Sequence, residues 1–142
     1  MKQELRLIGF NYTKINVERD QKEGKISLKS ALDIKEIKKS DIEALSLSSI
    51  NVKFSFSLEY ENLGSILLEG IIALTGEKEF LEEIEKQWKD KKLSDDLKMI
   101  ILNLIMQKCS LKALELEDEF NLPYHIQIPK LSLGKQDKEK SK

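Results

Sequence analysis

The chain has 142 residues, enough for one domain that buries about two-thirds of the surface exposed by its unfolded form. It is 40% hydrophobic and 35% charged, with 2 Pro and 6 Gly, which is typical of a globular fold and argues against a disordered or fibrous chain. The formal net charge is −1, and every basic residue except Arg6 and Arg19 is a lysine. We therefore expect no nucleic-acid partner.

The sequence also argues against a membrane span and a metal site. The longest apolar run, residues 99–106, is far shorter than the roughly 18–20 residues that a spanning helix requires. The N-terminal residues lack the apolar stretch of a secretory signal, so we expect a cytoplasmic location. The chain has a single cysteine, Cys109, and a single histidine, His125. We therefore expect no internal disulfide, no metal and no cofactor.

Alternation of apolar and polar residues predicts three strands in the first part of the chain. In residues 4–18 the alternation slips by one position near Thr13 and Lys14, which indicates a β-bulge. Residues 25–37 alternate as a second, half-buried strand. The third strand is the clearest, because its apolar positions alternate without error: Ile50, Val52, Phe54, Phe56, Leu58 and Tyr60.

A fourth strand is predicted over residues 65–76. Only residues 61–64 separate it from the third strand, and Gly64 can adopt a positive φ there, so the two strands should form an antiparallel hairpin. This strand is apolar on both faces, and something must cover or contact each of them, as a second subunit would. One face carries Ile66, Leu68, Ile72 and Leu74, and the other carries Leu67, Ile71 and Ala73.

The period then changes to that of a helix. Residues 77–92 predict a short charged helix with one apolar stripe, formed by Phe80, Leu81, Ile84 and Trp88. Ser94 is the expected N-cap of a longer helix that runs to about Glu119, roughly 37 Å at 1.5 Å per residue, with apolar residues at 97, 100, 101, 104, 105, 111 and 114. Pro123 and Pro129 end it, and residues 124–128 alternate as an extended segment.

The order of strands first and helices second predicts an α+β fold, in which a four-stranded antiparallel sheet is followed by two helices packed on one face. We predict a single domain over residues 1–133. The remaining residues, 134–142, predict a disordered, Lys-rich tail.

In this order of elements the chain resembles the SecB family of protein-export chaperones over nearly its whole length. Tyr12, Thr13 and Lys14, followed by alternating apolar residues, are similar to the family's first strand. The resemblance implies an ATP-independent holdase that binds unfolded polypeptide clients. It also implies a homo-oligomer, a tetramer made as a dimer of dimers.

The end of the long helix supports the same resemblance, but two other regions depart from it. Phe120, Pro123 and Pro129 look like the family's transition from the helix to an extended apolar segment. The charged helix over residues 77–92, however, stands where we expect a more open crossover. The Lys-rich tail does not resemble the end of SecB that contacts the SecA motor, so relatives that act without a motor or serve toxin–antitoxin systems fit equally well.

Six residues are candidates for client contact. Phe54, Phe56 and Tyr60 could line a client groove, although core packing is the favoured interpretation for each of them. Client contact is more strongly expected for apolar residues on the helix-free face of the sheet or in the crossover, namely Leu63, Ile71 and Trp88.

The sequence does not predict an enzyme. His125 would need an orienting carboxylate and a nucleophile close in space, and no motif nominates either. Cys109 lies in an apolar helix and is interpreted as a core residue. An alternative function is a carrier that holds a small apolar ligand between the sheet and the long helix.

Overall fold

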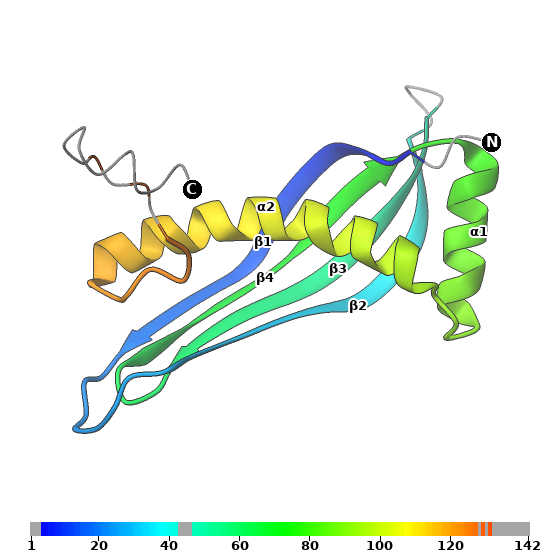
Figure 1. Ribbon diagram of the computed structural model, residues 1–142. Coiled ribbons are helices and arrows are strands. Elements are labelled where there is room, and N and C mark those ends of the chain that lie inside the picture. The colour runs from blue at the N-terminus through cyan, green and yellow to red at the C-terminus, as the bar shows by residue number, and fades with distance from the viewer. Residues whose placement is uncertain (1–3, 43–46, 128, 130, 132–142) are drawn as a thin grey trace, which may run out of the picture.

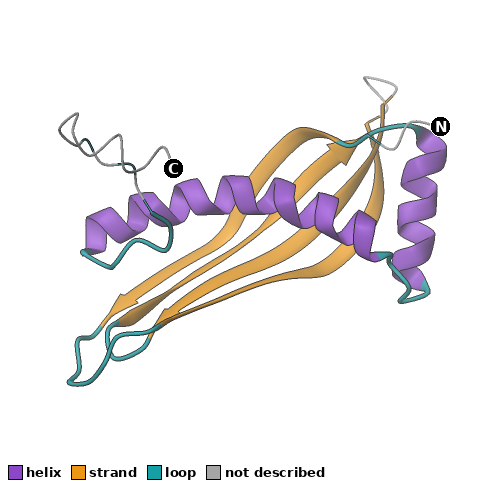
Figure 2. Ribbon diagram, viewed as in Figure 1, coloured by secondary structure: helices purple, strands orange, loops and turns teal. Residues whose placement is uncertain are grey.

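The computed structural model describes residues 4–42, 47–127, 129 and 131 (Figure 1). Four strands precede two helices, as predicted, and the strands form one antiparallel sheet in the order β1-β4-β3-β2. In Figure 2, α2 crosses one face of this sheet and α1 stands near its β2 side. The elements are β1 (Arg6–Arg19), β2 (Leu28–Ile42), β3 (Leu47–Tyr60), β4 (Gly64–Thr75), α1 (Lys78–Lys89) and α2 (Asp95–Phe120).

The predicted bulge in β1 is confirmed, because its register against β4 shifts between Tyr12 and Lys14. The predicted bounds of the second strand, in contrast, are wrong at both ends. Ile26 precedes β2 and is 49% exposed. A bulge in β2 between Ile34 and Glu36 resets the alternation, so that Ile37 faces the core. Pairing with β3 continues to Ile42, well beyond the predicted end.

The hairpin between β3 and β4 is confirmed, with Tyr60 opposite Gly64. The positive φ, however, belongs to Asn62, at 66°, and not to Gly64. Asn tolerates this left-handed conformation better than most residues. Gly64 serves another purpose, because a Cβ atom there would collide with the backbone carbonyl of Glu18 in β1.

The core lies between the sheet and the helices. It consists of alternate residues of β3 and β4, Ile37 of β2, the buried faces of both helices and a few residues of the connecting segments. Burying these apolar side chains is the main source of the fold's stability. Its largest fully buried members include Tyr60, Phe54, Phe56 and Phe80.

The long helix α2 begins as predicted. Ser94 is its N-cap, and the Ser94 hydroxyl accepts a hydrogen bond of 3.3 Å from the amide of Leu97. The predicted apolar stripe is wrong at Leu111, which is 68% exposed. The buried row repeats every fourth residue and therefore turns about 40° around the helix at each step. It comprises Leu97, Ile101, Ile105, Cys109, Ala113 and Glu117.

The chain after α2 is not the predicted extended segment. Asn121 takes a left-handed conformation, and the amide of Leu122 bonds the carbonyl of Glu117 at 2.9 Å, so the chain reverses direction. Leu122 is buried, while Tyr124 and Ile126 stay exposed. The expected strand-like alternation is replaced by turns and bends in the described residues. The predicted tail, 134–142, lies outside them.

Candidate client-binding surfaces

Four of the six candidate residues lie in the core. Phe54, Phe56 and Tyr60 are each 1% exposed, which agrees with the core-packing interpretation. Leu63 is 5% exposed and joins the core cluster, although we expected it on the helix-free face or in the crossover. The turn after β3 turns its side chain inward. These four side chains offer a client no surface on this protomer, so Ile71 and Trp88 are the members of the six that stay accessible.

The helix-free face of the sheet carries a narrow apolar strip. Leu67, Ile71 and Ala73 alternate along β4 with the core residues and are half-buried. Their paired neighbours are polar or small: for Ile71 these are Asn11 of β1 and Lys53 of β3. The strip is therefore one strand wide and is bordered by polar groups.

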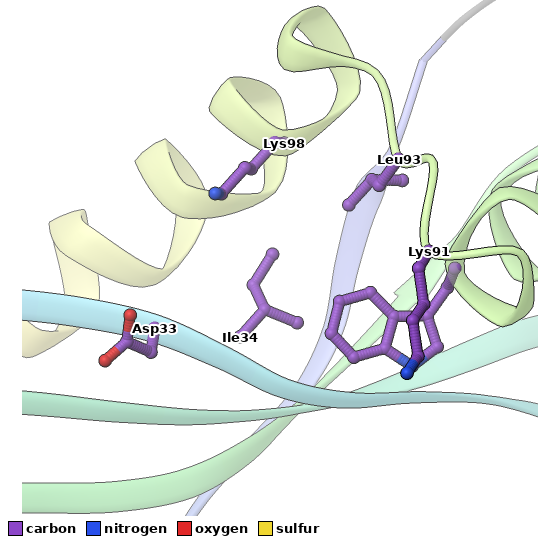
Figure 3. A pocket seen from close by; sticks show the side chains of 6 residues that line it. Asp33, Ile34, Lys91, Leu93 and Lys98 are labelled. Atoms are coloured by element: carbon purple, nitrogen blue, oxygen red, sulfur yellow. The ribbon is translucent and has the colours of Figure 1, made fainter.

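Trp88 lines a cavity of about 500 Å³ where α1, α2 and β2 approach one another (Figure 3). Trp88 ends the apolar face of α1, and its side chain packs against the core while staying half-buried. The other lining residues are Asp33, Ile34, Lys91, Leu93 and Lys98. The cavity thus combines apolar and charged groups.

The solvent side of α2 also presents large apolar side chains. Met99 is 54% exposed and Met106 is 37% exposed. They are separated by two helical turns and therefore lie on the same side of α2, away from the centre of the buried row. Exposed methionines suit contact with varied partners, because their side chains are flexible and polarizable.

A buried polar network ties the end of α2 to the sheet and to the segment that follows. The Tyr60 hydroxyl of β3 donates a hydrogen bond to Oε2 of Glu117, and Nδ1 of His125 lies 2.9 Å from Oε1 of the same carboxylate. Glu117 is fully buried and the His125 side chain is 7% exposed. Burial, reinforced by the Glu117 carboxylate, raises the pKa of Tyr60 well above its usual value.

Sequence reasoning missed this network, because it found no carboxylate for His125. The partner lies eight residues away, across a chain reversal that alternation does not reveal. An acidic residue inside the apolar row of α2 was the available signal. The His125 ring lies edge-on to Phe56, with centroids 6.2 Å apart, and its buried Nε2 has no hydrogen-bond partner in the described structure. A network so enclosed holds the fold together and is not open to a substrate.

Two further findings concern metals and membranes. Within residues 4–42, 47–127, 129 and 131, no three His, Cys, Asp or Glu side chains gather closely enough to hold a metal ion. Over the same residues, no helix has the length and apolar character needed to span a membrane.

Neither a family model nor a curated protein matches the sequence. Among solved structures, the chain is similar to a SecB-like chaperone of Mycobacterium tuberculosis in complex with a peptide from an antitoxin. The alignment covers 91% of each chain at 10% sequence identity, with a TM-score of 0.49. The function proposed below therefore rests on this chain's own sequence and geometry.

Proposed function

We propose that this protein is an ATP-independent holdase chaperone, which keeps non-native polypeptides soluble through apolar contacts. The observation that carries the proposal is the placement of large apolar side chains outside the core. They occupy several separate surfaces: the β4 strip with Ile71, the cavity with Trp88, and the side of α2 with Met99 and Met106. Separate apolar surfaces suit an extended client of varied sequence, because each site needs to hold only a short segment.

The sequence resemblance to the SecB family supports this proposal independently. The tetramer that the resemblance implies would also use the apolar surfaces on α2 and β4 for contacts between protomers. Association of protomers would cover part of the exposed apolar surface and would align the remainder into longer binding tracts. We propose a homo-oligomer made as a dimer of dimers, acting in the cytoplasm without a cofactor, a reaction or a SecA-type motor. Native mass spectrometry tests the assembly, and a monomer at every concentration would refute it.

A light-scattering assay tests the holdase itself. An aggregation-prone client is diluted from denaturant without ATP, with and without a several-fold excess of the protein. We expect lower and slower scattering, because bound client segments are withheld from one another. An inert protein of similar size and charge, at the same concentration, controls for crowding. Unchanged scattering at that excess would refute the holdase.

The alternative function is a carrier of a small apolar ligand. The cavity near Trp88 lies within the roughly 300–1,000 Å³ range of small-molecule sites. Half of its lining residues, however, are charged, and the space between α2 and the centre of the sheet is filled by side chains with almost no exposure. A lipid retained in the native mass spectrum would favour the carrier over the holdase.

A further inference from the structure

Half of the residues that line the cavity beside Trp88 come from the part of the chain that departs from the SecB pattern, namely the charged helix α1 and its connection to α2. Figure 3 shows its lining residues approaching from both sides. Trp88 and Leu93 come from α1 and the connection, and Ile34 comes from β2. All three are half-buried and pack against the core. They give the cavity an apolar wall that can hold a large side chain.

Two lysines flank this apolar wall. Lys91 has a positive φ of 57°, and its amide donates a hydrogen bond of 3.0 Å to the carbonyl of Trp88, so this turn fixes where the Lys91 side chain leaves the backbone. Lys98 extends from the first turns of α2 toward the opposite side of the cavity. Neither ammonium group forms an ion pair with a described carboxylate.

The charge of the cavity favours an acidic ligand. Two lysines against one carboxylate, Asp33, give its lining a formal charge of +1. The cavity at the β3–β4 turn has the opposite sign: four carboxylates against Lys22 give −3. A ligand that carries acidic groups is therefore attracted to the Trp88 cavity and repelled by the other.

The position of the cavity at the sheet edge favours an extended chain. β2 is an outer strand, so one of its sides has no strand beside it. Near Lys39, α1 covers that side, because the Lys39 amide donates to Glu85 at 3.0 Å. The cavity lies farther along β2, at Asp33 and Ile34. An extended segment lying along β2 there would place one side chain against Trp88.

Building on the proposed holdase function, we propose that this cavity binds an extended polypeptide segment with an apolar side chain beside acidic ones. The apolar side chain packs against Trp88, Ile34 and Leu93. The acidic side chains pair with Lys91 and Lys98. The site thereby biases the protein toward clients whose apolar segments are flanked by Asp or Glu.

Trp88 is the only tryptophan in the chain, so its fluorescence reports on this cavity alone. The probes are two tryptophan-free peptides with the same apolar centre, flanked by Asp in one and by Lys in the other. We expect the acidic peptide to change Trp88 fluorescence and to bind at least five-fold more tightly at low salt, with the preference shrinking at high salt. Equal affinities, or binding seen by peptide anisotropy without a Trp88 response, would overturn the proposal.

Charge reversal supplies a second arm. Lys91→Glu/Lys98→Glu should reverse the preference, whereas the control Lys86→Glu/Lys108→Glu, with the same change in net charge, should preserve it. If the double variant does not fold, as judged by its circular dichroism signal, Lys98→Gln alone is tested. It should lower the ratio of affinities for the acidic and the basic peptide at least two-fold. Reversal in the control would also overturn the proposal. If the protein suppresses aggregation but binds both peptides equally, the holdase proposal stands and the proposed preference for acidic clients is wrong. If it prefers the acidic peptide but does not suppress aggregation, the cavity proposal stands and the holdase proposal is wrong.

Discussion

The two faces of the sheet use the same strands for different purposes. On the covered face, alternate residues of β3 and β4 are nearly all below 2% exposure and pack beneath the helices. On the helix-free face, β3 presents Ser, Asn, Lys and Glu, and only β4 keeps an apolar strip with Leu67 and Ile71. One face therefore carries most of the stability, while the other leaves a narrow apolar strip accessible.

The largest expected effect comes from emptying the covered face. Phe54→Ala should lower the free energy of unfolding by about 3–5 kcal/mol, because the ring is 1% exposed and packs over Gly70. Ile71→Ala, on the other face, should cost less than about 1 kcal/mol. Urea denaturation followed by circular dichroism measures both. Similar losses for the two variants would mean that the faces do not differ in this way.

The next effect concerns the buried carboxylate beneath α2. Glu117→Gln should cost about 1–3 kcal/mol, because the amide cannot replace the charged acceptor of both Tyr60 and His125. Glu69→Gln, on the helix-free face, serves as the matched control and should change stability by about 0.5 kcal/mol or less. The same denaturation experiment compares them. A neutral Glu117→Gln would show that the network adds no stability.

Alkaline pH should weaken the covered face through Cys109. Burial raises the pKa of its thiol to about 12, above the ordinary value of 9.0. The folded state therefore retains a proton that the unfolded state loses, so this contribution is complete below about pH 9 and declines as pH rises toward 12. The slope from this group is at most about 1.4 kcal/mol per pH unit.

Unfolding of the wild type and of Cys109→Ala between pH 8 and 11 measures that slope. The variant should lose stability less steeply over this interval, because the ionising thiol is absent. The raised pKa of Tyr60 is common to both proteins and cancels in the comparison. The raised pKa of Tyr12 depends in part on Cys109, so the difference between the two curves reports the thiol together with its interaction with Tyr12. Parallel curves would show that the thiol does not contribute.

The smallest effect on stability is expected on the helix-free face. Leu67→Ser/Ile71→Ser should lower the free energy of unfolding by less than about 2 kcal/mol, because both side chains are already half-exposed. Thermal and urea unfolding measure the change. A loss as large as that of Phe54→Ala would assign the strip to the core.

Much of the sheet was predictable because alternation is a direct record of which residues face the core. β3, the β1 bulge at Tyr12–Lys14 and the hairpin follow from it. The end of β2 could not be predicted in this way, because the bulge after Ile34 shifts the alternation of apolar and polar residues by one position. In α2, the drift of the buried row around the helix misplaced Leu111, which local periodicity alone could not correct.

The candidate site was less predictable than the fold. Periodicity separates the two faces of a strand, and the polar second face of β3 indicates that Phe54 belongs to the core. The fourth strand is apolar on both faces, so its own sequence does not state which face the helices cover. The burial of Leu63 depends on the path of the turn after β3, which alternation does not predict. The cavity at Trp88 and the contact between Glu117 and His125 bring together residues from different elements, and only the tertiary structure shows them.

The holdase proposal is tested most directly by comparing aggregation suppression by the wild type and by Leu67→Ser/Ile71→Ser, both confirmed as folded, without ATP. If the helix-free face contacts clients, the wild type should suppress light scattering, and the variant should need a several-fold higher concentration for the same effect. A wild type that leaves scattering unchanged would contradict the chaperone function. A variant as effective as the wild type would contradict the role assigned to this face.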